Sequence, residues 1–446
     1  MSDQRLISRR TVLKSGAAGA AGVAALAALP ASAFAQSPSA PAGGAGYTAP
    51  PADTTATLTI SNWGDAHDKA VYDAVRQRFN AKYPNVLVND NFVPINGWSN
   101  YLNIILAEVA AGSAPDIISI AIEGVRQGLA ANLFMPLTNY VANDPQGAAL
   151  VGDVDQRLLD GLSKDGTLYL LPNTWNTMLV YYNTKMFAAA NIDRPKDDWT
   201  WDDFLAVAKK LTTGDGDSKV FGFALPNFNF GLTPFWYGAG TSQLNAEWTQ
   251  AQMTDQKFVD AVSWVRDLVT KEGVSPQPQG IDPYQLFPAG KAAMTGAGHW
   301  VVGDWKKAGF TDWDIVPWPQ KTNKASVYGV SGFAIYPETK VADLAWEYVK
   351  ELGSVQTQQD FVKVGGANPA LKSVGQSPEF LSQAPHSELY VNAIDYSLPV
   401  AAPTVFSTLE PSFLRAWSEI LAGSDPATSL GTANDEVNKA FADAAG

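Results

Sequence analysis

The sequence predicts an α/β fold, because apolar segments with strand and helix periods alternate from Thr54 onward. Residues 57–60 and 86–88 are short β-type runs. Residues 116–120 are apolar on both faces after the initial Asp, as strands in a buried parallel sheet require. Amphipathic helical segments separate the three runs, and this β-α-β-α-β order predicts a doubly wound α/β lobe.

The first two expected helices are supported by their apolar spacing. The first ends before Pro84, and its apolar positions recur every four residues at Val71, Val75 and Phe79. The second ends at the Gly-Ser-Ala-Pro break of residues 112–115. Its apolar stripe consists of Tyr101, Leu102, Ile105, Leu106 and Val109.

The alternation continues through the rest of the chain, without an internal repeat. Thr200 predicts a helix N-cap, because Asp203 follows three residues later. Further strands are expected at 168–171, 178–182, 292–295 and 332–335. Further helices are expected at 258–269, which Gly273 ends, and at 345–352.

The first 35 residues have the features of a cleavable export signal. Residues 8–14 (SRRTVLK) resemble the twin-arginine motif, with valine in place of the usual phenylalanine. A Gly/Ala-rich stretch at 16–29 is too short to favour a membrane anchor, and residues 33–35 form an A-x-A cleavage pattern. Residues 36–53 are rich in Pro, Gly, Ala and Ser and predict a flexible leader. We therefore expect export to the periplasm, cleavage near Ala35 and a soluble mature protein without stable membrane insertion.

Charge and composition exclude several classes of function. The net charge of -13 argues against a nucleic-acid partner, which requires clustered Lys and Arg. The absence of Cys excludes disulfide scaffolds, Cys-ligated metals and a lipid-anchored Cys. The three histidines, at 67, 299 and 386, have neither zinc-ligand nor catalytic-triad spacing. We therefore expect no metal and no cofactor.

The common catalytic and nucleotide-binding motifs are also absent. Gly290-Lys291 lacks the remainder of a P-loop, and no G-x-G-x-x-G follows a strand. Residues 329–333 resemble a nucleophile elbow but end in Phe instead of Gly. Residues 215–218 (DGDS) favour a turn over a calcium loop, although bound calcium stays open. With 44 acidic residues, a glycosidase carboxylate pair also stays open, but the absence of catalytic motifs favours a protein that is not an enzyme.

The tryptophans give the strongest signal for a binding site. There are 14 of them, and Trp63, Trp98, Trp175 and Trp300 follow strand-like runs or lie in turns. Open α/β sheets bind ligands at the carboxyl ends of their strands. A pyranose has apolar C–H faces that pack on aromatic rings and hydroxyls that need fixed polar partners. One tryptophan alone is more often core, but this set with Asn and Asp neighbours indicates a sugar site.

Four segments in order resemble the extracellular solute-binding proteins of ABC importers, in the sugar-binding family that includes maltose-binding protein. They are residues 58–65, residues 110–118 (AAGSAPDII) followed by 133–137, residues 165–183 followed by 199–204, and residues 287–300 followed by 328–335. The resemblance implies a periplasmic-binding-protein-like α/β fold, with two doubly wound lobes joined by a hinge and a ligand cleft between them. Lobe one is expected at 54–170 plus 288–336, and lobe two at 171–287 plus 337–446.

The resemblance also implies the function. The chain is expected to be a monomeric receptor that captures a mono- or oligosaccharide by hinge closure and delivers it to the transmembrane permease subunits. Which sugar it binds, and whether the output is transport or signalling, stay open. A receptor of the same fold for a polyamine or iron is an alternative, and a secreted carbohydrate-active hydrolase is another.

The resemblance implies twelve ligand-binding residues. They are Asn62, Trp63, Asp65, Trp98, Glu123, Trp175, Asn176, Trp236, Trp300, Gly329, Ser331 and Arg415. Glu123 matches an acidic acceptor for sugar hydroxyls, with a helix N-terminal charge as the alternative. Trp300 matches a recurring stacking aromatic, whereas Trp236 and Arg415 have core packing and a surface ion pair as alternatives. His299 precedes Trp300 where the family commonly has Pro, and polar residues are sparse nearby, so the pocket is expected to be more apolar than in maltose receptors.

Overall fold

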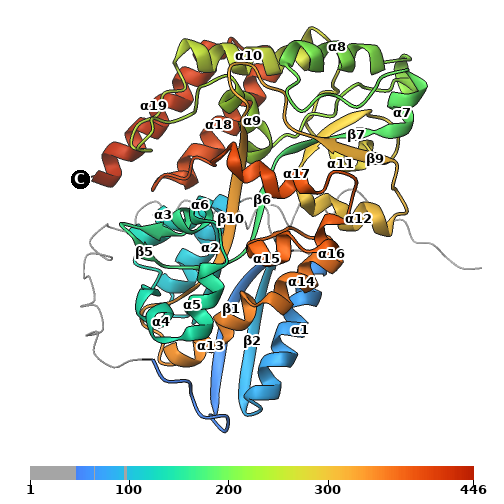
Figure 1. The fold of residues 1–446 in the computed structure, drawn as a ribbon. Helices are drawn as coiled ribbons and strands as arrows, with labels where there is room; N and C mark the ends of the chain where they lie inside the picture. The colour runs from blue at the N-terminus through green and yellow to red at the C-terminus, as the bar shows by residue number, and fades with distance from the viewer. Residues whose placement is uncertain (1–46, 65, 95–97, 446) are drawn as a thin grey trace, which may run out of the picture. The chain divides into compact units, whose positions relative to one another are not determined.

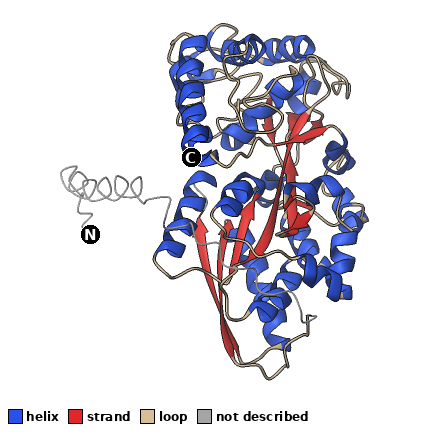
Figure 2. Ribbon diagram, turned by 90° about the vertical axis from the view of Figure 1, so that its left-hand side faces the viewer, coloured by secondary structure: helices blue, strands red, loops and turns tan. Residues whose placement is uncertain are grey.

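The computed structural model describes residues 47–64, 66–94 and 98–445, and two of the three β-sheets in this part of the chain organise the fold. The larger sheet has the strand order β11-β6-β10-β3-β1-β2, with β12 also paired to β10. The smaller sheet has the order β8-β7-β9. Helices lie on both sides of the strands, as Figure 2 shows. The predicted two-lobed α/β class is confirmed.

The N-terminal elements follow the predicted β-α-β-α-β order. They are β1 (Ala56–Gly64), α1 (Ala66–Lys82), β2 (Val86–Pro94), α2 (Trp98–Ala110) and β3 (Ile117–Ala121). Strand β1 pairs in parallel with both β2 and β3, and every residue of β3 is buried. Asp116 ties these strands together, because its carboxylate accepts hydrogen bonds from the Thr59 amide and hydroxyl at 2.8 and 2.7 Å. This contact gives Asp116 a structural role.

Two long strands connect the halves of the described structure (Figure 1). Strand β10 (Ser326–Ile335) pairs antiparallel with β3 and with β6 (Leu171–Thr177). The chain leaves β6 directly for β7 (Leu179–Asn183), the central strand of the smaller sheet. Strands β8 (Met294–Ala297) and β9 (Trp313–Val316) pair antiparallel on either side of β7. The backbone of β6 and β7 therefore links the two sheets.

Helices pack around the smaller sheet through aromatic contacts. Helix α8 (Trp201–Leu211) begins with the predicted capping box, in which Thr200 and Asp203 exchange hydrogen bonds. Trp201 stacks on Trp264 with ring centroids 4.1 Å apart. The other large helices here are α9 (Asn229–Gly238), α10 (Gln256–Thr270), α18 (Phe406–Leu421) and α19 (Pro426–Ala445).

Shorter elements complete the described chain. After β3 come α3 (Ile122–Ala130), α4 (Thr138–Asn143), α5 (Pro145–Gly152), α6 (Gln156–Gly161), β4 (Ser163–Lys164) and β5 (Thr167–Leu168). Around the smaller sheet lie α7 (Thr184–Ala189), α11 (Pro283–Leu286) and α12 (Val302–Lys307). Toward the end come β11 (Asn368–Pro369), α15 (Lys372–Gly375), α16 (Pro378–Leu381), α17 (Glu388–Asn392) and β12 (Ser397–Pro399). No helix of the described residues is long and apolar enough to span a bilayer.

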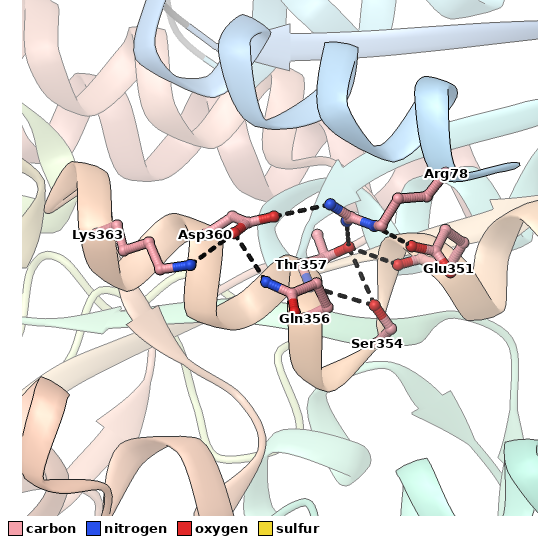
Figure 3. A network of polar contacts seen from close by, with 7 residues as sticks. All are labelled: Arg78, Glu351, Ser354, Gln356, Thr357, Asp360 and Lys363. Carbon is pink, nitrogen blue, oxygen red and sulfur yellow. Dashed lines mark hydrogen bonds and ion pairs between the residues drawn. The ribbon is translucent and has the colours of Figure 1, made fainter. Parts of the chain in front are cut away.

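Helices α13 (Ala342–Leu352) and α14 (Val355–Val364) pack against α1. Arg78 of α1 holds them by ion pairs with Glu351 at 2.5 Å and Asp360 at 2.8 Å, and it donates to the Thr357 hydroxyl at 2.7 Å (Figure 3). We expected all of 337–446 in lobe two. For these two helices the packing differs, because the chain returns to the half that contains β1 once β10 has ended. Three strands also differ from the expected boundaries. Strands β8 and β9 lie within 288–336 but pair with β7 in the smaller sheet, whereas β6 begins at residue 171 and belongs to the larger sheet.

Candidate ligand-binding site

A cavity of about 500 Å³ lies between elements of both halves of the fold. One wall comes from the end of β1 and from α2 and α3, and the facing residues come from the segments that begin α9, α12 and α18. Nine aromatic side chains line the cavity: Trp63, Tyr72, Trp98, Trp175, Phe228, Phe230, Trp300, Phe361 and Phe406. Its volume is within the range of small-molecule pockets, which are mostly apolar with a few fixed polar groups.

Eight of the twelve sequence-predicted residues line this one cavity. They are Trp63, Trp98, Glu123, Trp175, Asn176, Trp300, Gly329 and Ser331. Strand pairing brings several of them together, because Gly329 lies opposite Asn176 and Ser331 lies opposite Thr174 across the β10–β6 ladder. Residues separated by more than 150 positions in the sequence thus share one surface.

Asn62 does not line the cavity. Neighbouring side chains of a strand point to opposite faces, so Asn62 turns away from the side taken by Trp63. It is fully buried, and its amide donates to the Asp90 carboxylate at 2.9 Å. The expectation for Asn62 is therefore corrected to a structural contact between β1 and β2. Asp65, also predicted as a contact, lies outside the described residues.

Trp236 and Arg415 also lie away from the cavity. Trp236 is 2% exposed and packs with Phe258 and Phe413 at centroid distances of 5.5 and 5.2 Å. Arg415 is largely exposed and pairs with Glu436 at 2.6 Å. Both residues adopt the structural alternatives, core packing and a surface ion pair, and the ligand-binding expectation is corrected for each.

Two tryptophans of the first lobe meet at the cavity wall. The rings of Trp63 and Trp98 pack edge to face, with centroids 4.6 Å apart and an interplanar angle of 79°. The Trp63 Nε1 atom is buried and has no hydrogen-bond partner among the described residues. Buried polar groups are nearly always satisfied by protein, water or ligand. This N–H is therefore a donor suited to a ligand oxygen.

Trp300 lies within a group of aromatic rings on the other wall. Phe228, Phe230 and Tyr284 approach it edge-on at centroid distances of 6.3, 6.2 and 6.3 Å. Gly329 allows this arrangement, because a Cβ atom at that position would lie 3.1 Å from the Phe230 ring. The half-buried Trp300 indole thus keeps accessible surface at the cavity while its neighbours hold its orientation.

Hydrogen bonds fix the strand that carries Trp175. The Trp175 Nε1 donates to the Pro369 carbonyl at 3.1 Å, and the neighbouring Asn176 Oδ1 accepts from the His299 amide at 3.1 Å. The His299 ring is buried between Phe380 and Tyr390, at 5.2 and 4.8 Å. Burial lowers the pKa of His299 to about 3, which keeps the ring neutral. His299 therefore acts as a packing residue behind Trp300.

Two of the four carboxyl side chains that line the cavity, Glu123 and Glu410, are largely buried. Glu123, in the first turn of α3, is 4% exposed, and its Oε2 has no partner among the described residues. Burial, with a smaller contribution from Glu410, raises the pKa of Glu123 to about 8. Glu410 of α18 accepts a hydrogen bond from the Ser99 hydroxyl at 2.7 Å, and burial raises its pKa as well. The pair can accept hydrogen bonds or hold a positive charge.

Sequence reasoning missed several lining residues. Asn229 is 1% exposed, its Oδ1 accepts from Gln243 at 2.9 Å, and its Nδ2 has no partner among the described residues. The Phe-Asn-Phe run at 228–230 was a detectable signal, because aromatics flank an amide after a Pro-Asn turn. Other missed members were Asp68, Tyr72, Thr174, Asp304, Phe361, Phe406 and Glu410. No group of three or more His, Cys, Asp or Glu side chains that could hold a metal occurs in the described part of the chain.

Comparison with known proteins gives consistent matches. Residues 74–388 match the family described as bacterial extracellular solute-binding protein. An uncharacterized ABC transporter extracellular-binding protein of Pyrococcus horikoshii is 23% identical over 430 residues, which cover 88% of each chain. An ABC substrate-binding protein of Listeria monocytogenes, solved with cycloalternan, is 22% identical with a TM-score of 0.78, and the match covers 87% of this chain and 100% of that one. A maltose-bound protein of T. maritima is 17% identical with a TM-score of 0.76 and corresponding coverages of 86% and 100%.

Proposed function

The chain belongs to the bacterial extracellular solute-binding protein family, and we propose that it is the substrate-receptor subunit of an ABC importer for a small carbohydrate. The observation that carries this proposal is the composition of the cavity. Nine aromatic side chains surround it, and three buried polar atoms at its wall have no partner among the described residues. These atoms are Trp63 Nε1, Asn229 Nδ2 and Glu123 Oε2. Aromatic faces suit the C–H faces of a pyranose, and fixed donors and acceptors suit its hydroxyls.

The construction of the cavity supports capture by hinge closure. Trp63, Trp98 and Glu123 come from the half with the larger sheet, whereas Asn229 and Trp300 come from elements around the smaller sheet. A ligand that contacts both walls gains interactions only in the closed form, and this difference shifts the equilibrium toward closure. The two strands that connect the halves are where such a motion would bend.

The proposed cellular role is delivery of the sugar to transmembrane permease subunits. Membership of an extracellular family supports export, and the twin-arginine pattern at residues 8–14 supports a route by which the folded protein reaches the periplasm. An iron receptor would need paired tyrosines, and Tyr72 is the single tyrosine among the described residues that line the cavity. The proposed protein is a receptor that binds and releases its ligand unchanged.

The test is a thermal-unfolding screen of the mature protein against mono- and oligosaccharides, polyamines and ferric chelates, with product analysis for every hit. A ligand present at about 100 times its Kd stabilises the folded state by about 2.7 kcal/mol. A saccharide that raises the unfolding midpoint and is recovered intact supports the receptor. Cleaved product would instead identify a hydrolase, and stabilisation by polyamines or iron alone would overturn the carbohydrate assignment.

The variant Trp300→Ala tests whether a ligand found in the screen binds in this cavity. Loss of the indole face removes about 60 Å² of apolar contact with a sugar, worth about 1.5 kcal/mol and therefore about tenfold in Kd. Trp264→Ala is the matched control, because the half-buried Trp264 stacks on Trp201 at 4.1 Å within one half and does not line the site. Equal loss of ligand stabilisation in both variants would show that binding occurs elsewhere.

A further inference from the structure

The charges around the cavity are one-sided. Four carboxyl side chains line it, from Asp68, Glu123, Asp304 and Glu410. No Lys, Arg or His occurs among the described residues that line it. Neutral sugars need donors as well as acceptors, and anionic sugars need positive charge. The carboxyl groups of Glu123 and Glu410, with no cationic side chain among these lining residues, therefore disfavour sugar acids and sugar phosphates.

The strongest local feature is the pair formed by Glu123 and Glu410. Neither carboxyl group has an ion-pair partner among the described residues, and Glu410 contributes to the raised pKa of Glu123. Glu123 is more than nine-tenths buried, and its Oε2 lacks any hydrogen-bond partner there. Because an unpaired buried charge costs several kcal/mol, the Glu123 carboxyl group avoids ionisation while the cavity is empty. A positive group beside both carboxyl groups would stabilise their ionised forms.

We propose that the ligand is a saccharide with a basic nitrogen, an amino sugar or an amine-linked oligosaccharide, whose ammonium group lies between Glu123 and Glu410. This inference rests on the proposed function and specifies the substrate class of the same cavity. The surrounding aromatic side chains favour it too, because a cation is attracted to the faces of tryptophan, tyrosine and phenylalanine rings. Phe406 begins the helix that carries Glu410, and Trp98 begins the helix that follows β2.

An ammonium group beside Glu123 changes the protonation of its carboxyl group. An ammonium group favours the ionised form of a carboxyl group, and the raised pKa of Glu123 means that this group is mostly protonated below pH 7. Binding of an amino sugar therefore releases a proton from Glu123. Through linkage, its affinity rises by up to about tenfold per pH unit between pH 5.5 and 7. A neutral sugar does not require this ionisation.

The experiment compares matched saccharides on the full mature chain by isothermal titration calorimetry. The probes are glucose, glucosamine and glucuronate, the corresponding galactose set, cellobiose with its diamino counterpart, and the amino counterpart of each neutral sugar that stabilises the protein. We expect each binding amino sugar to bind at least tenfold more tightly than its neutral counterpart, and the uronates to bind weakest. Titration at pH 6.5 in two buffers of different protonation enthalpy should reveal proton release for the amino sugar only.

The variant Glu123→Gln tests the proposed partner of the ammonium group. We expect the ratio of amino-sugar to neutral-sugar affinity to fall about tenfold or more, and the proton release to disappear. Glu419→Gln, an exposed residue of the same helix as Glu410, is the control and should leave the ratio unchanged. Neutral sugars that bind as tightly as their amino counterparts in the unmodified protein would overturn this inference and leave the carbohydrate receptor standing. If no saccharide binds, the inference and the proposed function are both overturned.

Discussion

Arg78 offers a direct test of how the fold supports the cavity. It joins α1, which carries Tyr72, to the segment that carries Phe361, and both of these aromatic side chains line the cavity. The variant Arg78→Met keeps the aliphatic part of the side chain but removes the guanidinium. Glu351 and Asp360 then lose their bonds to the guanidinium, and the buried hydroxyl of Thr357 loses a donor.

The size of the effect follows from exposure. Fully buried charged hydrogen bonds contribute about 1.5–3 kcal/mol each, whereas exposed ion pairs contribute about 0.2–1 kcal/mol. The side chains of Arg78, Glu351 and Asp360 are 29%, 26% and 19% exposed, so each bond falls between these limits. We expect Arg78→Met to lower the free energy of unfolding by about 2–3 kcal/mol in total.

Urea unfolding followed by tryptophan fluorescence measures this change as a shift in midpoint at constant m-value. Lys363→Met is the matched control in the same network (Figure 3), because Lys363 is 53% exposed and bonds Asp360 at 3.2 Å. Its loss should cost less than about 0.5 kcal/mol. Equal effects of the two substitutions, or no measurable effect of Arg78→Met, would refute the argument that this network holds α13 and α14 on α1.

Three further predictions concern the cavity and its surroundings. Gly329→Val should weaken saccharide binding at least tenfold in calorimetry while circular dichroism stays unchanged, because even a Cβ atom there lies 3.1 Å from the Phe230 ring. The raised pKa of Glu123 means that its stabilising contribution is complete below pH 4 and is lost as the pH rises toward 8. The unfolding free energy without ligand should therefore fall over this interval, and Glu123→Gln should flatten the decline. His299→Leu should stabilise the protein by about 1 kcal/mol in urea unfolding, because both ring nitrogens of His299 are buried without partners among the described residues; destabilisation would contradict this.

The elements that could be predicted from the sequence are those specified by local pattern. The first five alternate as expected because each carries its own periodicity, and the Thr200 cap was predictable because its partner lies three residues away. Strand β6 was expected to end at residue 171, whereas it runs from 171 to 177. Its Pro and Asn residues have a low intrinsic preference for strands. In the structure β6 pairs with β10 on one side and with β11 on the other, and this pairing stabilises the strand.

The candidate site was predictable only where a residue follows a strand or lies in a recognisable segment. Trp236 and Trp300 look alike in the sequence, yet one is 2% exposed in the core of a helix layer and the other faces the cavity. Phe361 was not predictable because it lies in an ordinary amphipathic helix. Its exposure to ligand depends on where α14 packs, and the chain carries no local signal for its return to α1. Burial is a property of the tertiary fold, so residue type alone could not separate these cases.

The position of Glu410 connects ligand charge to the contact between the two halves of the fold. Its carboxylate accepts the Ser99 hydroxyl of α2, and one turn earlier Ser407 exchanges hydrogen bonds with Gln127 of α3 at 3.0 and 3.3 Å. Helix α18 therefore touches the opposite half at the same place where it supplies a wall of the cavity. The Glu410 carboxyl group bonds to Ser99 of the opposite half and also lines the cavity, so Glu410 takes part both in the contact between the halves and in the wall of the cavity. A ligand cation bound at Glu410 would therefore lie next to a contact between the halves.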